Sequence, residues 1–271
     1  MRSPETQAWS GDAAVRWTAL AGLALAAAAG AAESVCPTGR AALQAMLSSE
    51  YAFAGKAQTS VSSAFLAFLA DDSLVLNPAP QPGRAVYLAA KNSAYHGHFL
   101  TVWKRDARCR WRVQFDGGTS HAAPTSVEPK LRPAQASFAL AAPPPTAAQF
   151  HHAAGQAVSG FQGTEQREGF ASALRTYGRR ADFRFYTDGQ TPIDGVTAAS
   201  SYLNAHAMAG AWKEAARGRS ADSTLLYCVG ELTDSSHQST HAYVQIWQYD
   251  PKAANWGLRV LLVNPLPRTH Q

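Results

Sequence analysis

Two stretches of the chain repeat the same alternation of apolar and polar residues. Each has a strand-like segment that ends in Trp, a polar turn, and a second strand-like segment that begins with Trp. The segments are residues 99–103 and 111–115 in the first copy, and residues 243–247 and 256–260 in the second. Alternation at a period of two predicts β-strands with one face on a core. We therefore expect two related β-hairpins, an internal repeat that favours two structural units over one.

The residues before each hairpin follow one order of elements. Helices come first, followed by a short strand, a loop with Pro or Gly, and a short helix. Apolar residues at helical spacing and the positions of Pro and Gly set the limits of these elements. The expected elements are 39–70 (two helices), 73–76 (strand) and 84–91 (helix) in the first half, and 149–177 (helix), 182–186 (strand) and 196–206 (helix) in the second.

The two halves differ in the length of chain that leads into the hairpin. Gly83 and Trp103 are 20 positions apart, whereas Gly195 and Trp247 are 52 positions apart. The second half uses part of this difference for a strongly apolar strand at residues 224–232. We therefore expect the first half to lack sheet strands that the second half has.

The limits of the units are marked by composition. Arg2 and Arg16 precede an apolar run at residues 17–29, and small residues follow as at a signal-peptidase site. The run is shorter than the ~20 residues of a membrane-spanning helix, so we expect a cleaved signal and an exported, periplasmic protein that is not held in the membrane. A stretch rich in Pro, Ala and Ser separates the halves as a linker. The expected domains are 1–32 (signal peptide), 33–118 (abbreviated first unit), 119–148 (linker) and 149–267 (second unit).

The bulk composition describes a folded chain. Hydrophobic residues make up 46% and charged residues 16%, which excludes wholesale disorder. The formal net charge is +5, but no run of Lys or Arg exceeds two residues, and acidic residues lie among them. We interpret the excess as solvated surface and expect no nucleic-acid partner.

Three cysteines leave two interpretations open. Cys228 lies in an apolar strand and Cys109 in the turn of the first hairpin, while Cys36 follows the expected cleavage point. The favoured interpretation makes Cys228 a small buried apolar residue and Cys109 incidental. The alternative is a disulfide between Cys36 and Cys109, since an exported protein is exposed to oxidising conditions.

Taken together, these patterns resemble a known superfamily. The residues that carry the resemblance are 64–72, 82–84, 98–105 and 111–118 in the first half, and 183–186, 194–195 and 243–261 in the second. They resemble the nuclear transport factor 2-like superfamily, and within it the SnoaL-like, ketosteroid isomerase-like branch, in tandem. The resemblance implies an α+β fold, in which a curved, mostly antiparallel sheet packs on amino-terminal helices as a cone. Its open end would hold a small, mostly apolar molecule, and we expect the intact cavity in the second half.

The second hairpin supplies the candidate ligand pocket. Tyr243, Gln245 and Trp247 alternate on one strand face, as in a pocket wall, although a convex sheet face or an interface has the same composition. Four further residues would join the pocket if this face is the inner one: Tyr186, Trp212, Tyr227 and Arg259.

A catalytic site has weaker support in the sequence. Proton abstraction next to a carbonyl needs a carboxylate base and a hydrogen-bond donor, for which Asp116 and His98 are the candidates in the first half. We favour an ordinary turn at Asp116, because two glycines follow it, and the matching position in the second half is Leu261. His96 and His98 have a spacing that a metal could use, but no further ligand accompanies them, so we expect neither a metal nor a cofactor.

The favoured hypothesis is therefore an exported module that binds a small apolar molecule or a partner, with no catalytic residue assigned. The alternative is an isomerase or polyketide cyclase-like enzyme that uses Asp116 as base. In either case, we expect the two units to pair as an intramolecular pseudo-dimer, or the whole chain to form a homodimer.

Overall fold

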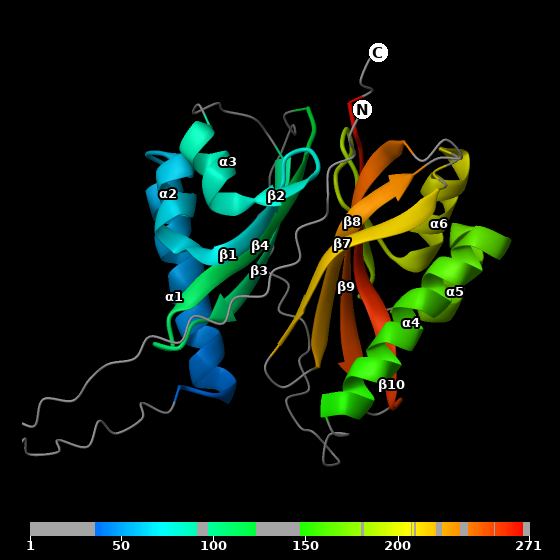
Figure 1. Cartoon of the computed structure of the whole chain (residues 1–271), viewed down its shortest axis with the longest axis horizontal. Coiled ribbons are helices and arrows are strands. Elements are labelled where there is room, and N and C mark those ends of the chain that lie inside the picture. Colours follow the sequence, from blue (N-terminus) through cyan, green and yellow to red (C-terminus); the bar gives the residue numbers. More distant parts are fainter. Residues whose placement is uncertain are drawn as a thin grey trace, which may run out of the picture. The chain divides into compact units, whose positions relative to one another are not determined.

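The computed structural model describes residues 36–90, 97–122, 147–179, 182–206, 208, 210–220, 224–233, 238–251 and 253–267 (Figure 1). These residues belong to one compact unit, Cys36–Gln271. They form helices and two mixed sheets, which confirms the predicted α+β class. The expected signal at 1–32, most of the expected linker and His96 lie outside the described residues.

The first half contains a four-stranded sheet and three helices. Its strand order is β2-β1-β4-β3. The predicted pair of helices is confirmed, and Ser60 starts the second of them because its side chain accepts a hydrogen bond from the Ser63 amide at 3.2 Å. The elements are α1 Gly39–Ala57, α2 Val61–Phe68, β1 Leu69–Leu76, β2 Pro80–Pro82, α3 Gly83–Ala89, β3 Gly97–Arg105 and β4 Trp111–Ser120.

The second half contains a six-stranded sheet and three helices. Its strand order is β6-β5-β10-β9-β8-β7. The predicted helix at 149–177 is interrupted at Gly169, whose φ of 82° lies in the region that favours glycine. The elements are α4 Ala147–Glu168, α5 Phe170–Tyr177, β5 Arg184–Tyr186, β6 Ile193–Asp194, α6 Val196–Ala205, β7 Ala211–Arg219, β8 Leu225–Thr233, β9 Ser239–Asp250 and β10 Asn255–Pro265.

The two sheets correspond strand by strand over four positions. In each sheet a short strand pairs in parallel with the last strand of the hairpin: β1 with β4, and β5 with β10. The hairpins themselves, β3–β4 and β9–β10, are antiparallel, as predicted. Strands β7 and β8 have no counterpart among the described residues of the first half, which agrees with the shorter chain there.

Both hairpins contain a β-bulge at the same place. Gln114 is the extra residue in β4, and Arg259 is the extra residue in β10. Each is three positions after the Trp that opens its strand. An extra residue reverses which face the following side chains occupy. As a result, Asp116 and Leu261, which occupy matching positions after the bulge, both face the helices of their own half.

Three apolar clusters hold the unit together. One lies between the six-stranded sheet and helices α4 to α6, and includes Phe161, Trp247 and Leu261. Figure 1 shows these helices on one face of that sheet. A smaller cluster joins α2 to the four-stranded sheet through Phe65 and Val113. The third cluster contains residues of both sheets, among them Phe115, Tyr227, Val244, Ile246 and Leu262.

The cysteines are arranged as in the alternative interpretation. Cys36 and Cys109 form a disulfide, so the interpretation of Cys109 as incidental is wrong. Cys228 is a buried free thiol, as predicted. The bridge depends on a tertiary approach between the start of α1 and the β3–β4 turn, which residue spacing alone does not specify.

Candidate functional site

A cavity of about 660 Å³ opens in the six-stranded half, where α4 and α6 end and α5 and β7 begin. Its wall is apolar at Phe170, Leu203 and Met208, and polar at Glu165 and Asn204. The cavity lies in the second half, but none of the residues predicted for a pocket there belongs to its wall. Strand β7, which has no counterpart among the described residues of the first half, supplies part of the wall through Ala211.

Glu165 is the carboxylate of this cavity. Its side chain belongs to the last turn of α4, and the residue is only 5% exposed. Glu165 Oε2 accepts a hydrogen bond from Trp212 Nε1 at 2.8 Å. Burial raises the pKa of Glu165, and the bond from Trp212 opposes that rise only in part. The site therefore holds a carboxyl group that ionises less readily than one in water.

Sequence reasoning did not identify Glu165, although a signal was present. Ala154, Val158, Phe161 and Glu165 are spaced by four, three and four residues, and all four are buried. This spacing gives one face of a helix, so a carboxylate ends an otherwise apolar face. A charged residue at such a position is seldom buried without a partner, which marks it as a candidate site residue.

Four residues of the predicted pocket share the face of the sheet that the helices cover. Tyr243, Gln245 and Trp247 are fully buried, so they fill this core and do not line an open pocket. Trp247 Nε1 donates a hydrogen bond to Gln245 Oε1 at 3.0 Å. Trp212 packs edge-on against Tyr243, with ring centroids 4.7 Å apart, and connects this buried layer to Glu165.

The other three predicted pocket residues are not at this site. Tyr186 and Tyr227 belong to the cluster shared by the two sheets, because they lie on the opposite face of their strands. Arg259 is the bulge residue of β10, where it donates to Gln248 and lies 3.4 Å from Asp182. The predicted pocket thus mixes two faces of one sheet, and none of its seven residues belongs to the wall of this cavity.

A second buried carboxyl group lies in the first half. Asp116 is 5% exposed, and its Oδ2 accepts a hydrogen bond from the Tyr87 hydroxyl at 2.9 Å. Its Oδ1 has no partner among the described residues. Burial raises the pKa of Asp116 to about 7, with a further contribution from the charge of Glu50, while the Tyr87 bond acts in the opposite direction. Asp116 is not part of the wall of the cavity at Glu165.

His98 is not the partner of Asp116. Asp116 pairs with Thr101 across the hairpin, so both point to the helix side, whereas His98 is three residues earlier on β3 and points to the other face. His98 Nδ1 lies 2.9 Å from His121 Nε2. Burial and the charges of His121 and Arg184 lower the pKa of His98. Tyr87 on α3 takes the donor position beside Asp116 instead.

The described residues contain no group of three or more His, Cys, Asp or Glu side chains that could hold a metal ion. Within the same part of the chain, no helix combines the length and the apolar character needed to cross a membrane.

Comparisons with known proteins give similarity at the level of structure. No protein-family model and no curated protein matched the sequence. Solved structures similar to this chain include nuclear transport factor 2-like proteins. One, of unknown function from Shewanella oneidensis, is 11% identical with a TM-score of 0.34, over 42% of this chain and 98% of its own. Another of unknown function, from Pseudomonas putida, is 11% identical with a TM-score of 0.34, over 45% and 90%. A third, a suggested dehydratase of this family from Streptomyces avermitilis, is 14% identical with a TM-score of 0.33, over 43% and 96%.

Proposed function

We propose that this chain is an exported protein that binds a small molecule in the six-stranded half, at Glu165. The observation that carries the proposal is a cavity whose wall is largely apolar and contains one buried carboxyl group. Export is supported only by the amino-terminal pattern, in which Arg2 and Arg16 precede an apolar run and small residues.

The cavity has the properties of a small-molecule site. Its volume of about 660 Å³ lies within the range of ligand pockets in proteins. Phe170, Leu203 and Met208 offer apolar surface, and Glu165 offers a fixed polar group. Such a combination binds an apolar body by removing it from water and orients it through one polar contact.

The carboxyl group restricts the chemistry of the ligand. Glu165 already accepts one hydrogen bond from Trp212, and its carboxylate can accept more. A ligand with an N–H or O–H group would satisfy it, and a protonated amine would also lower its raised pKa. A ligand that brings an anion to this point would be repelled. We therefore propose an apolar ligand that carries an amine or hydroxyl donor.

The test is a thermal-shift screen of the mature protein with apolar amines, apolar alcohols and the corresponding acids. We expect amines or alcohols to raise the melting temperature and acids to have no effect. Glu165→Gln should reduce the shift strongly. Asn204→Trp should also reduce it, because Asn204 is an exposed residue of the wall and a Trp there would occupy part of the cavity. Glu168→Gln is the matched control, since Glu168 is on the same helix but exposed.

The same screen can contradict the proposal. A shift that Glu165→Gln and Glu168→Gln reduce equally would be an effect of net charge and not of this site. The absence of a shift with every compound, in a protein that melts cooperatively, would remove the small-molecule function.

The alternative function is proton abstraction next to a carbonyl at Asp116. This chemistry needs a carboxyl group and a hydrogen-bond donor, and Asp116, with its pKa raised to about 7, accepts a hydrogen bond from the Tyr87 hydroxyl. The test is turnover of an enolisable ketone by the wild type and by Asp116→Asn and Tyr87→Phe. Activity that Asp116→Asn leaves unchanged would remove this alternative.

A further inference from the structure

A second cavity, of about 410 Å³, lies in the first half and was not predicted from the sequence. It is bounded by the end of α2, the start of β1 and the turn end of the β3–β4 hairpin. Charged side chains dominate its wall. The cations are Arg84, Lys104, Arg105, Arg110 and Arg112, and the carboxylates are Asp71, Asp72 and Asp106. Cations therefore outnumber carboxylates.

Asp106 is fully engaged by the turn that contains it. Its Oδ2 accepts a hydrogen bond from Arg110 Nε at 2.8 Å, and its Oδ1 accepts from the backbone amides of Arg108 at 2.9 Å and Arg110 at 3.0 Å. Desolvation raises the pKa of Asp106, but the hydrogen bonds and charge of Arg110 and the Arg108 amide outweigh it and lower the pKa to about 2. Asp106 thus remains ionised, and both of its carboxylate oxygens already accept hydrogen bonds.

The remaining cations are incompletely compensated. Arg112 Nε lies 3.6 Å from Asp106 Oδ2, which Arg110 already occupies, and Arg112 Nη1 donates to the Ala67 carbonyl at 2.8 Å. One carboxylate is thus shared by two guanidinium groups, and the Arg112 side chain is only 23% exposed. The side chains of Arg84 and Lys104 have neither a hydrogen-bond partner nor an ion-pair partner among the described residues.

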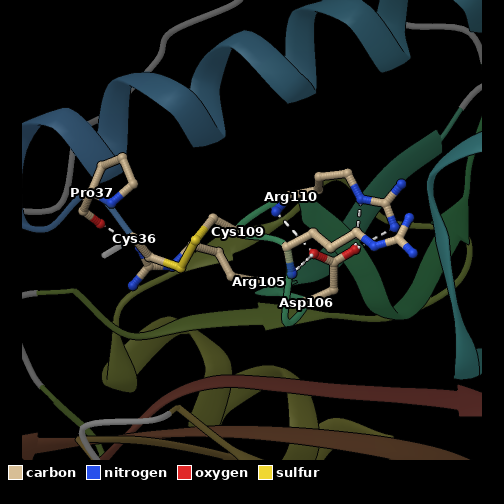
Figure 2. Close-up of a disulfide and its surroundings, with 7 residues drawn as sticks. Cys36, Pro37, Arg105, Asp106, Cys109 and Arg110 are labelled. Carbon is tan, nitrogen blue, oxygen red and sulfur yellow. Dashed lines mark hydrogen bonds and ion pairs between the residues drawn. A yellow bond between two sulfur atoms is a disulfide. The ribbon is translucent and has the colours of Figure 1, made fainter. Parts of the chain in front are cut away.

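The turn that presents these cations is fixed to the start of α1. Figure 2 shows the Cys36–Cys109 disulfide beside the Asp106–Arg110 pair, with Arg105 directed to the Pro37 carbonyl. The Arg105 guanidinium also lies over the Trp111 ring, 5.5 Å from its centroid. A turn held at several points loses little further freedom when a ligand binds, and this reduces the entropic cost of binding.

We propose that this cavity binds the oxyanion group, carboxylate or phosphate, of a small molecule. Arg112 lines the cavity, and its one printed ion-pair partner, Asp106, is shared with Arg110. A planar guanidinium matches the two oxygens of a carboxylate or phosphate. Lys104 and Arg84 add positive charge at the wall. Asp71 and Asp72 are exposed, so water screens them more than it screens the half-buried Arg112.

The test is calorimetric titration of the full chain with inorganic phosphate and, separately, with citrate, at constant ionic strength. We expect saturable binding of at least one of them at one site. Binding of phosphate but not citrate would indicate a phosphorylated ligand, and binding of citrate but not phosphate would indicate a carboxylate ligand. Binding of both would indicate a site for oxyanions in general.

The double variant Arg84→Gln with Lys104→Gln should weaken this binding about tenfold. Both side chains are exposed and without partners in the described structure, so the variant is expected to fold. Lys213→Gln is the matched control, an exposed strand lysine outside this cavity, and should leave the affinity unchanged. Glu165→Gln should also leave it unchanged, which separates this site from the proposed ligand site. No saturable binding of either anion, or equal weakening by the double variant and by Lys213→Gln, would overturn the proposal.

Discussion

The buried carboxyl group of Asp116 should make the stability of this protein depend on pH, and Asp116→Asn isolates its contribution. The side chain is 5% exposed, accepts one hydrogen bond from Tyr87, and leaves Oδ1 without a partner among the described residues. Asn has nearly the same shape as a protonated Asp, and it cannot ionise. The substitution therefore removes the titration while it changes the packing little.

The sign and size follow from the two pKa values of Asp116. Its ordinary value is 3.8, and burial raises it to about 7 in the folded protein. Between these values the folded state holds a proton that the unfolded chain releases, so the free energy of unfolding falls as pH rises. One pH unit corresponds to about 1.4 kcal/mol, so the full interval of about 3 units costs the wild type about 4 kcal/mol.

The assay is urea unfolding of the wild type and Asp116→Asn at several values between pH 4 and pH 8. We expect the two proteins to have similar stability near pH 4, and the variant to be more stable above pH 7 by up to about 4 kcal/mol. Asp71→Asn, which changes an exposed carboxylate of the same half, is the control. Its plot of unfolding free energy against pH should be parallel to that of the wild type. Parallel curves for Asp116→Asn and the wild type across the whole range would refute the reasoning.

Two further predictions concern the covalent and steric constraints of the fold. The double variant Cys36→Ser with Cys109→Ser removes a disulfide that spans 73 residues. Its free energy of unfolding, measured in urea titrations, should be lower than that of the wild type by about 4 kcal/mol. A loss below about 1 kcal/mol would contradict this prediction. Gly230→Ala should destabilise the protein by about 2 kcal/mol or more, because a Cβ there would lie 2.1 Å from the Lys213 carbonyl oxygen. Gly155→Ala should stabilise it slightly, because Gly155 lies on α4 with open space around its Cβ position. Equal melting temperatures for the two glycine variants would contradict this.

The sequence was sufficient to predict the hairpins, because their alternation at period two and their Trp residues are local features. It was not sufficient to predict the faces of every strand. One extra residue in each hairpin, Gln114 and Arg259, reverses the alternation, and a bulge has no strong local signature. The assignment of Tyr227 to the pocket failed for a related reason, since either face of a strand buried on both sides can be apolar.

The sequence predicted neither the residues nor the chemistry of the candidate site; only the choice of the second half agrees with the cavity at Glu165. The intact cavity was expected in the second half, and the carboxylate was sought at the strand position matched by Leu261. The carboxylate comes from α4 instead, as Glu165. A search along strands could not find it, whereas the apolar face of the helix, which Glu165 interrupts, would have marked it.

The position of the ligand site follows from how the two faces of the six-stranded sheet are used. Helices α4 to α6 cover one face, and apolar residues of the four-stranded sheet, such as Phe115, contact the other. We infer from this second contact that the two halves act as an intramolecular pseudo-dimer. Both faces of the six-stranded sheet are then covered. The cavity at Glu165 lies at the end of the sheet, where β7 begins and α6 ends, and a ligand would enter there. The proposed site for an apolar ligand therefore lies in the half with the longer sheet, at an end to which β7 contributes Ala211, and Asp116 of the first half is not part of its wall.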